Sequence, residues 1–295
     1  MKNNNIKPVL KWVGGKRELI PDIRVYYEFL NPNKYVEPFF GGGSVYFDIL
    51  NVLGDSHKNT SIINDVNVDL IQLYRDIKVS PNDIINCCKE LEKEYHKYGY
   101  YHIRSHFNGV DREGEVVDKY RGIIRSSSLI LLNRTCFNGL YRVNKKGLFN
   151  VPKGSYKNPK ILDEDNLFKV SNNLPPVEQI LNKQFDDIDD INKGDLVYFD
   201  PPYHPLSTTS SFTSYSGNFG EEEQLRLMKY FTKLNNDGVY VLLSNSSSPF
   251  IKSIYNSFNI IEVYCRRNIN SKSSGRGKIP EYLILGDYVK KHKFK

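Results

Sequence analysis

The stretch Leu196–Tyr203 reads LVYFDPPY, and the interpretation of the whole chain starts from it. Four apolar residues predict a short buried strand, which ends at an acid, two prolines and an aromatic ring. Each proline fixes its own φ, lacks an N–H and pushes the preceding residue towards extended geometry. The carbonyl groups of Asp200 and Pro201 are therefore kept out of a helix, where they can accept hydrogen bonds from a ligand.

The side chains of this corner suit a planar ligand that carries an amino group. The Asp200 carboxylate is a charged acceptor, and Tyr203 offers a flat aromatic face. A plain turn at the end of a strand is the alternative, because Asp and Pro are common in turns. The tetrapeptide alone leaves both interpretations open, and the rest of the sequence favours a chemical role.

A second motif lies upstream, at residues 35–50, which read YVEPFFGGGSVYFDIL. Glycines between a strand and a helix let a cofactor approach the backbone at the positive end of the helix. The next apolar run ends at Asp65, 22 residues after Gly43, and that is about the spacing at which a second-strand carboxylate reaches ribose hydroxyls. These features predict a nucleotide-like cofactor.

The glycine patterns argue against two common cofactors. The motif reads P-F-x-G-x-G, whereas dinucleotide sites read G-x-G-x-x-G. The GGKR at 14–17 looks like a phosphate-binding loop, but Leu10 stands where the first glycine belongs and Arg17 replaces the magnesium-binding Ser or Thr. An ATP-binding loop therefore lacks two required positions.

Further motifs occur along the chain: LKWVGGKR at 10–17, ND at 64–65, NGLYRVN at 138–144, FNVP at 149–152, YKNP at 156–159 and SNSSS at 244–248. Together with EPFFGGG at 37–43 and DPPY at 200–203, and in this order, they resemble the motifs of the Dam-type adenine-N6 DNA methyltransferases of the D12 class with alpha motif order, many of which act on GATC. The resemblance covers most of the chain, whereas KQF at 183–185 departs from the Gly-Asp-Phe of the family.

The resemblance implies an α/β fold: a Rossmann-like, doubly wound S-adenosylmethionine-dependent methyltransferase sheet with an inserted, mostly helical target-recognition lobe that carries a β-hairpin. Short apolar runs that alternate with helical stretches also indicate a parallel sheet wound with helices. The catalytic domain is expected at 1–69 and 176–295, and the inserted DNA target-recognition domain at 70–175. Strands are expected near 34–38, 60–64, 177–181, 195–199, 238–243, 259–264 and 281–285.

The implied cofactor is S-adenosylmethionine, with S-adenosylhomocysteine as product, and no metal is expected. Lys16 suits the methionine carboxylate, with Trp12 beside it, although core packing is the alternative for this only tryptophan. Asp65 is expected at the ribose hydroxyls, Phe185 near the cofactor adenine, and Asp200 at both the methionine amine and the target base. Further cofactor contacts are expected from Glu37, Pro38, Phe39, Gly41 and Gly43.

The implied reaction transfers a methyl group to the N6 amino group of an adenine in double-stranded DNA. Hydrogen bonds from this amino group to the Asp200 carboxylate and the Pro201 carbonyl would favour a pyramidal nitrogen, so that catalysis is mostly positioning and electrostatic preorganisation. The base must leave the duplex, at a cost of a few kcal/mol, and stacking on Tyr203 would offset ~1–3 kcal/mol.

Residues 140–152, LYRVNKKGLFNVP, predict a β-hairpin with glycine at its bend. Such a ribbon fits the major groove, where arginine reads guanine through two hydrogen bonds, and the resemblance gives this role to Arg142. A solvated surface residue is the alternative for each DNA contact. The other implied contacts are Lys11 at the outer guanine, Asn138 in the space left by the flipped base, apolar Leu140 and Pro152, Asn144, and Tyr156 at a phosphate.

Two polar segments are further candidates. The segment 207–220 follows the corner and is expected to close over the flipped base. The segment 271–278 is basic and suits phosphates, with a surface loop as the alternative.

The composition agrees with a nucleic-acid partner. The 41 basic against 34 acidic residues give a net charge of +7 and a pI near 9.0, which suits a polyanion. The four cysteines form no C-x-x-C pattern, so neither zinc nor disulfides are expected. A polar start and short apolar runs predict no signal peptide and no membrane span, hence a cytoplasmic protein. The sequence leaves the oligomeric state open, and a monomer is the default expectation.

Three alternatives remain open: an RNA adenine-N6 methyltransferase, a DNA cytosine-N4 methyltransferase, and a non-catalytic DNA-binding module. The leading Asp of the corner, the hairpin and the block order favour DNA adenine. A cognate restriction endonuclease that acts on the same site without a stable complex is a possible partner, and the sequence leaves the physiological role and the exact recognition site open.

Overall fold

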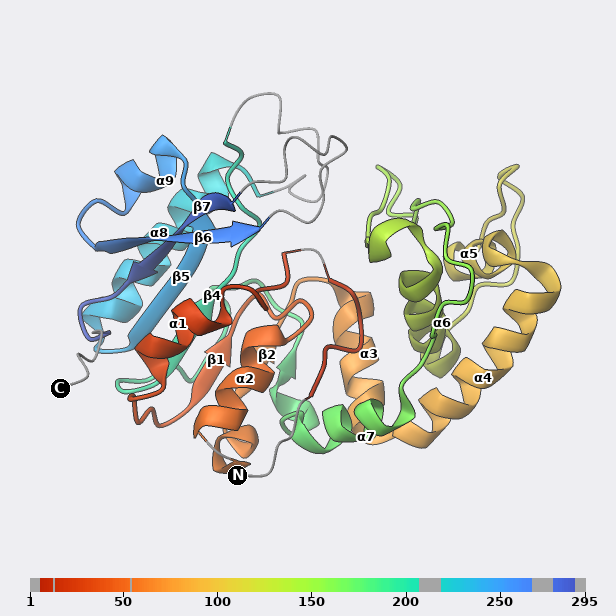
Figure 1. Ribbon diagram of the computed structural model, residues 1–295, viewed down its shortest axis with the longest axis horizontal. Helices are drawn as coiled ribbons and strands as arrows, with labels where there is room; N and C mark the ends of the chain where they lie inside the picture. Colours follow the sequence, from red (N-terminus) through yellow and green to blue (C-terminus); the bar gives the residue numbers. More distant parts are fainter. Residues whose placement is uncertain (1–5, 13, 54, 207–218, 267–277, 290–295) are drawn as a thin grey trace. The chain divides into compact units, whose positions relative to one another are not determined.

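The structure is a computed structural model that describes residues 6–12, 14–53, 55–206, 219–266 and 278–289 (Figure 1). Contacts divide the chain into two compact units, and each is described by itself. Unit 1 comprises Met1–Gly15, Gly41–Phe47 and Asn67–Asn182. Unit 2 comprises Lys16–Phe40, Asp48–Val66 and Lys183–Lys295. The domain boundaries expected from the sequence stay a prediction.

Among the described residues, seven strands form one sheet in the order β3-β2-β1-β4-β5-β7-β6 (Figure 1). Each overlaps an expected apolar run, and the α/β fold class is confirmed. The strands are β1 (Tyr35–Glu37), β2 (Ile62–Asn64), β3 (Ile180–Leu181), β4 (Leu196–Phe199), β5 (Tyr240–Ser246), β6 (Asn259–Arg266) and β7 (Lys278–Leu285).

The directions of the strands differ from a wholly parallel sheet. β1 runs parallel to β2 and β4, and β4 runs parallel to β5. β7, however, pairs antiparallel with both β5 and β6. The parallel arrangement predicted for the whole sheet is therefore wrong for β7, because an apolar run carries no information about strand direction.

Burial explains why the central strands read as continuous apolar runs. Every residue of β1 and β4 is buried, as expected for parallel strands that are covered on both faces. Phe231 of α8 (Glu221–Asn236) is fully buried and packs edge-on against Tyr255 and Phe258. The other α-helices that lie wholly or partly in unit 2 are α1 (Ile20–Tyr27), α2 (Ser44–Leu53) and α9 (Pro249–Ile254).

Unit 1 is mostly helical, and residues 70–175, where a mostly helical lobe is expected, lie within it. α6 contributes an unbroken buried stretch, 126–133, to its core, although this helix has little amphipathic pattern. Small serines come before aliphatic residues in this stretch and all of them are buried, so the helix is buried on more than one side. The α-helices of this unit, apart from α2, are α3 (Val68–Val79), α4 (Pro81–Tyr98), α5 (Tyr100–Asn108), α6 (Gly122–Thr135) and α7 (Glu164–Asn173).

The predicted hairpin is present in unit 1 as an antiparallel bridge between Val143 and Phe149. The Asn144 N–H donates to the Leu148 carbonyl. Gly147, with φ of +73°, takes the left-handed conformation that the bend requires.

Candidate active site

The strand order reverses next to β1, and this reversal positions the candidate site. From β1 the chain builds outward to β2 and β3, then returns to place β4 on the other side of β1. Val36 pairs with Val197 in parallel register, so Glu37 and Asp200 emerge at the same edge of the sheet. Ligands of open α/β sheets bind outside the carboxyl ends of the strands at such a switch point.

An ion pair lies at this edge. The Lys16 Nζ is 2.7 Å from an Asp200 carboxylate oxygen, and only 6% of the Lys16 side chain is exposed against 20% of Asp200. The same Nζ lies 4.6 Å from the centroid of the Tyr203 ring, within the range of a cation–π contact. Lys16 therefore joins the carboxylate and the aromatic ring of the corner, a contact that the sequence motifs did not predict.

Burial dominates the proton affinity of Asp200. Burial raises the pKa of its carboxyl to about 6, Lys16 opposes the rise by stabilising the charged form, and the negative Glu281 adds to it. The group is therefore mostly ionised at neutral pH but titrates close to it, as is common for residues of functional sites.

Tyr203 is held by its hydroxyl. The Oη donates a hydrogen bond of 2.8 Å to a Glu281 carboxylate oxygen, on β7. Burial, together with the charges of Asp200 and Glu281, raises the pKa of Tyr203 well above its usual value, so the hydroxyl remains a donor. The sequence assigned only the ring of Tyr203, and its stacking role stays a prediction.

Two buried amide side chains form hydrogen bonds with the backbone at the DPPY corner. The Gln224 Nε2 donates to the Pro202 carbonyl at 2.9 Å, and the Asn245 Nδ2 donates to the Gln224 Oε1 at 3.0 Å. The Asn245 Oδ1 accepts from the His204 N–H at 3.1 Å, and both amides are fully buried. Asn245 lies in the SNSSS block, but Gln224 carries no sequence signal, so its role was missed.

Aromatic rings gather at the expected adenine end of unit 2. Phe39 stacks on Phe185 with centroids 5.4 Å apart, and the Arg226 guanidinium lies 4.5 Å from the Phe185 centroid. The Asn64 side chain donates to the Pro38 carbonyl at 2.9 Å and accepts from the Lys183 N–H at 2.9 Å. The departure KQF at 183–185 is thus fastened to the end of β2.

The acidic candidates near β1 and β2 lie in different surroundings. Glu37 is 2% exposed and accepts a hydrogen bond of 2.7 Å from the Tyr35 hydroxyl. Asp65 follows the carboxyl end of β2 and is half-buried. Their expected contacts with a cofactor stay predictions.

The glycine turn packs closely on Trp12 in unit 1. A Cβ on Gly41, whose φ is +52°, would lie 2.8 Å from the Trp12 ring, so no side chain fits there. Gly43 is also left-handed, with φ of +72°. Trp12 itself stacks on Tyr141 at 5.4 Å between centroids. Packing, the alternative considered for Trp12, is therefore real, and a cofactor contact stays a prediction.

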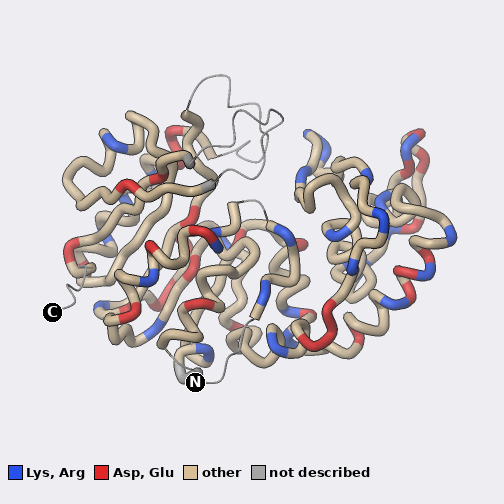
Figure 2. Tube along the Cα trace, in the orientation of Figure 1, with Lys and Arg blue, Asp and Glu red and all other residues tan. Residues whose placement is uncertain are grey.

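Most predicted DNA-contacting side chains are exposed in unit 1. Leu140 is half-buried, whereas Lys11, Asn138, Arg142, Asn144, Pro152 and Tyr156 are exposed. Lys11 Nζ lies 4.5 Å from the Tyr156 ring centroid. Arg142 Nε donates to Asn150 at 2.7 Å. Figure 2 shows the charged positions along the chain, and residues 140–157 contain basic but no acidic residues.

Two of these residues have conformational roles as well. The Asn144 Oδ1 accepts from the N–H groups of Lys146 and Leu148, and thereby shapes the hairpin bend. Asn138 is one of two non-glycine residues with positive φ among the described residues. Neither finding tests a contact with DNA.

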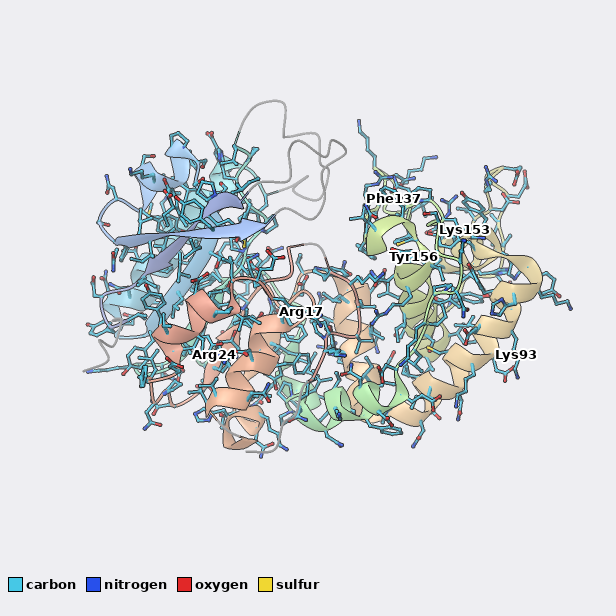
Figure 3. The ribbon with its side chains drawn as sticks, viewed as in Figure 1. Arg17, Arg24, Lys93, Phe137, Lys153 and Tyr156 are labelled. Carbon is cyan, nitrogen blue, oxygen red and sulfur yellow. The ribbon has the colours of Figure 1, made fainter. Side chains whose placement is uncertain are left out.

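Phe137, which the sequence assignment missed, is 50% exposed directly before Asn138. It lies in the same part of unit 1 as Tyr156 and Lys153 (Figure 3). An exposed aromatic ring of this kind can wedge between base pairs. Its only sequence signal is its position beside the NGLYRVN block, since an aromatic residue after an apolar helix is expected in the core.

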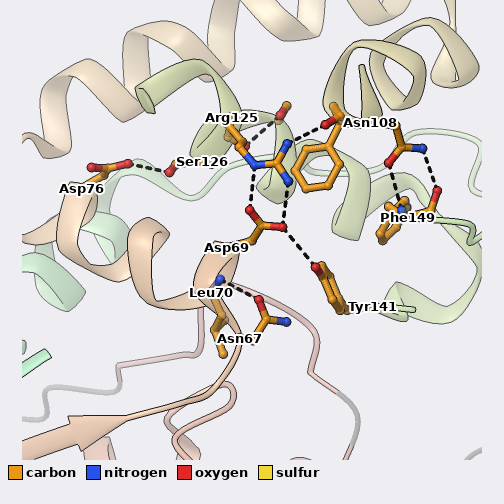
Figure 4. A network of polar contacts seen from close by, with 11 residues as sticks. Asn67, Asp69, Leu70, Asp76, Asn108, Arg125, Ser126, Tyr141 and Phe149 are labelled. Carbon is orange, nitrogen blue, oxygen red and sulfur yellow. Dashed lines mark hydrogen bonds and ion pairs between the residues drawn. The ribbon is translucent and has the colours of Figure 1, made fainter. Parts of the chain in front are cut away.

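An ion pair between Arg125 and Asp69 supports the hairpin within unit 1 (Figure 4). Arg125 of α6 binds both carboxylate oxygens of Asp69 on α3, at 2.7 and 2.9 Å. The Tyr141 hydroxyl donates to the same carboxylate at 3.1 Å. Tyr141, the residue before Arg142, is thereby bound to α3 directly and to α6 through the ion pair. No local sequence motif predicted this contact.

Other expectations concern metals, membranes and loops. Within the described ranges, no group of three His, Cys, Asp or Glu side chains could hold a metal, and no helix is long and apolar enough to cross a membrane. The four cysteines are free thiols. The predicted covering segment lies outside the described residues from 207 to 218, and so does the basic segment from 271 to 277.

The ion pair makes a prediction about titration. Replacing Lys16 with Met removes the cation beside Asp200, so the pKa of Asp200 should rise above about 6. The measurement is carbon NMR of labelled Asp carboxyl groups, with the Asp200→Asn spectrum for assignment. Lys34→Met is the control, because Lys34 pairs with Asp190 and Asp195. An unchanged Asp200 titration in Lys16→Met would contradict the electrostatic account.

Comparisons with known proteins bear on this site. The family model of the D12 class N6 adenine-specific DNA methyltransferases matches residues 12–269. The chain is 41% identical over 286 residues to the type II methyltransferase M1.LlaDCHI of Lactococcus lactis subsp. cremoris, covering 95% of each chain. It is 42% identical over 298 residues to the type II methyltransferase M.MjaIII of Methanocaldococcus jannaschii, covering 95% of this chain and 99% of that one.

A third relative carries a different name. A DNA adenine methylase of Vibrio cholerae is 34% identical over 280 residues, with 94% of each chain covered. The matched family is specific for adenine and acts on DNA. The match therefore argues against the three alternatives: an RNA methyltransferase, a cytosine methyltransferase and a non-catalytic module. The chain belongs to the D12 class of N6 adenine-specific DNA methyltransferases.

Proposed function

We propose that this enzyme transfers a methyl group from S-adenosylmethionine to the N6 of an adenine that is extruded from duplex DNA, within GATC. The observation that carries the proposal is the Lys16–Asp200 pair in the DPPY corner, at the strand-order switch point. S-adenosylmethionine supplies a methyl group activated on a sulfonium centre.

The residues of unit 2 fit such a cofactor. The ammonium of Lys16 has three N–H donors and can bind the methionine carboxylate as well as Asp200. The stacked Phe39 and Phe185 offer apolar surface to a purine, and Asp65 follows β2, where a carboxylate can accept from ribose hydroxyls. In unit 1, the tight approach of Gly41 to Trp12 shows a backbone turn with no room for a side chain.

The corner would orient the target amino group. The ionised Asp200 accepts one N–H and the Pro201 carbonyl accepts the other, so that the nitrogen lone pair is directed away from both. The hydrogen bonds that Pro202 and His204 make with the buried amides keep the corner rigid. Catalysis then depends on positioning and preorganised electrostatics, with no covalent enzyme intermediate.

Base extrusion would use aromatic side chains. Tyr203 stacks on the extruded adenine, which offsets part of the cost of unstacking, at ~1–3 kcal/mol. Phe137, half exposed, wedges into the duplex, and Asn138 takes the space of the missing base.

Recognition of GATC would rest on the hairpin. Arg142 reads a guanine in the major groove, and the bend shaped by Asn144 presents it. Lys11 contacts the outer guanine, Leu140 and Pro152 make apolar contacts, and Tyr156 binds a phosphate. The basic and acid-free composition of 140–157 supports a contact with DNA.

A physiological role follows from the relatives. Two of them are named type II methyltransferases, which supports a restriction-modification role beside an endonuclease that acts on the same site without a stable complex. We expect the enzyme to act as a cytoplasmic monomer.

Asp200→Ala tests the reaction centre. Transfer of labelled methyl from S-adenosylmethionine to duplex DNA should fall by at least ~1000-fold, because the amino group loses its charged acceptor. DNA binding, measured by fluorescence anisotropy, should remain within about threefold of wild type. Asp237→Ala, at the exposed end of α8, is the matched control. Normal turnover by Asp200→Ala would refute the proposed function.

Arg142→Ala tests the recognition hairpin. Loss of a bidentate contact to guanine should cost about 1–3 kcal/mol of binding free energy and relax discrimination at that base alone. Lys146→Ala, on the exposed bend, is the control for a general loss of positive charge. Binding is compared on GATC duplexes and on duplexes with single substitutions. An equal loss on every sequence would make Arg142 a phosphate contact instead.

A further inference from the structure

Glu281 lies beside the DPPY corner, although no motif includes it. β7 lies between β5 and β6, and its Glu281 pairs with Ser246 on one side and Val263 on the other. Its half-buried carboxylate accepts a hydrogen bond of 2.8 Å from the Tyr203 hydroxyl. The antiparallel direction of β7, which was not predicted, thus brings an acid to the edge of the sheet where the DPPY corner lies.

The contacts around Tyr203 form a continuous chain. Glu281 holds the hydroxyl at one end of the ring, Lys16 lies 4.6 Å from the ring centroid, and the same ammonium is 2.7 Å from Asp200. The ring is therefore constrained at its tip and on one face. A phenylalanine in its place would lose the constraint at the tip.

We propose that Glu281 is a positioning residue for methyl transfer: its carboxylate fixes the Tyr203 ring beside Lys16 and Asp200. The inference rests on the proposed function, in which Tyr203 stacks on the target adenine and Asp200 accepts its amino group. A ring with a fixed tip presents its face in one orientation, and this lowers the entropic cost of aligning the base.

The charge of Glu281 has a second effect, on Asp200. Its negative charge disfavours ionisation of Asp200 and acts against Lys16. Removing this charge while keeping the hydrogen bond should therefore lower the pKa of Asp200 from about 6. The titratable groups that interact with Asp200 are Lys16 before α1, Tyr198 on β4, Tyr203 in the corner and Glu281 on β7. Further out, Glu37 on β1 interacts with Tyr198, and Cys265 on β6 interacts with Glu281 and Lys16.

Three variants separate the hydrogen bond from the charge. Glu281→Gln keeps an oxygen that can accept from the Tyr203 hydroxyl but removes the charge. Glu281→Ala removes both, and Tyr203→Phe removes the hydrogen bond but keeps the charge. Glu262→Gln is the matched control. Glu262 is exposed and pairs with Tyr282, the neighbour of Glu281 on β7, so it lies on the opposite face of the sheet from Glu281.

Two measurements are made on each variant. The first is the single-turnover rate of methyl transfer to duplex DNA at saturating cofactor, from pH 5 to 9. The second is the carbon NMR titration of Asp200 in the protein without cofactor or DNA. Thermal unfolding of each variant checks that the sheet is intact.

The expected rates follow the hydrogen bond, and the expected titrations follow the charge. At pH 8, Glu281→Gln should stay within about threefold of wild type, whereas Glu281→Ala and Tyr203→Phe should each be slower by roughly tenfold. The titration of Asp200, and the acidic limb of the rate profile, should move down by roughly half a unit or more in both Glu281 variants. Neither should move in Tyr203→Phe or Glu262→Gln.

Three results would each overturn the inference. The first is a rate for Glu281→Ala equal to that of wild type at pH 8, and the second is a rate for Glu281→Gln as low as that of Glu281→Ala. The third is an unchanged titration of Asp200 in Glu281→Gln. Because the titration requires neither cofactor nor DNA, its failure is independent of the proposed function, which the loss of turnover in Asp200→Ala tests separately.

Discussion

The ion pair between Lys16 and Asp200 is the constraint around which the catalytic corner is arranged. A carboxylate that is only 20% exposed loses much of its hydration, and the ammonium beside it, with 6% exposure, loses more. Each charge offsets the cost of the other, so removal of one partner leaves the other poorly compensated. The raised pKa of Asp200 is the remaining cost, and it keeps the carboxylate close to the pH at which it changes charge. In the proposed reaction the site accepts an amino group, and such a carboxylate suits this role because it is ionised but only weakly hydrated.

The sheet makes this pair possible. The parallel pairing of β1 with β4 brings the ends of two strands distant in sequence to one edge, and β7 adds Glu281 at the same corner. Prolines alone would give a rigid corner without a fixed direction. Gln224 and Asn245 supply the direction, since they satisfy a carbonyl and an N–H of the corner while fully buried. Buried polar networks of this kind are useful only when every member is paired.

The sequence predicted the features that depend on local pattern. The seven apolar runs, the glycine turn, the DPPY corner and the hairpin bend at Gly147 each carry a signal within a few residues. What it missed depends on pairing between distant segments. These features have no periodicity or spacing that a sequence could reveal. They are the antiparallel direction of β7, the Lys16–Asp200 ion pair, the hydrogen bond from Gln224 to the corner, and the Asp69–Arg125 pair that binds Tyr141. Exposed Phe137 was missed for the opposite reason, since its residue type suggests burial.

The most direct test of the central claim is to methylate duplex oligonucleotides with labelled S-adenosylmethionine and to identify the modified base. The duplexes carry GATC, GTTC or a scrambled site in the same flanking sequence. The account predicts N6-methyladenine, and only in the GATC duplex. Label on adenines outside GATC would retain the reaction centre and contradict the assignment of the hairpin. Label on cytosine, or no transfer to any of the duplexes, would contradict the central claim that the Asp200 corner methylates adenine in DNA.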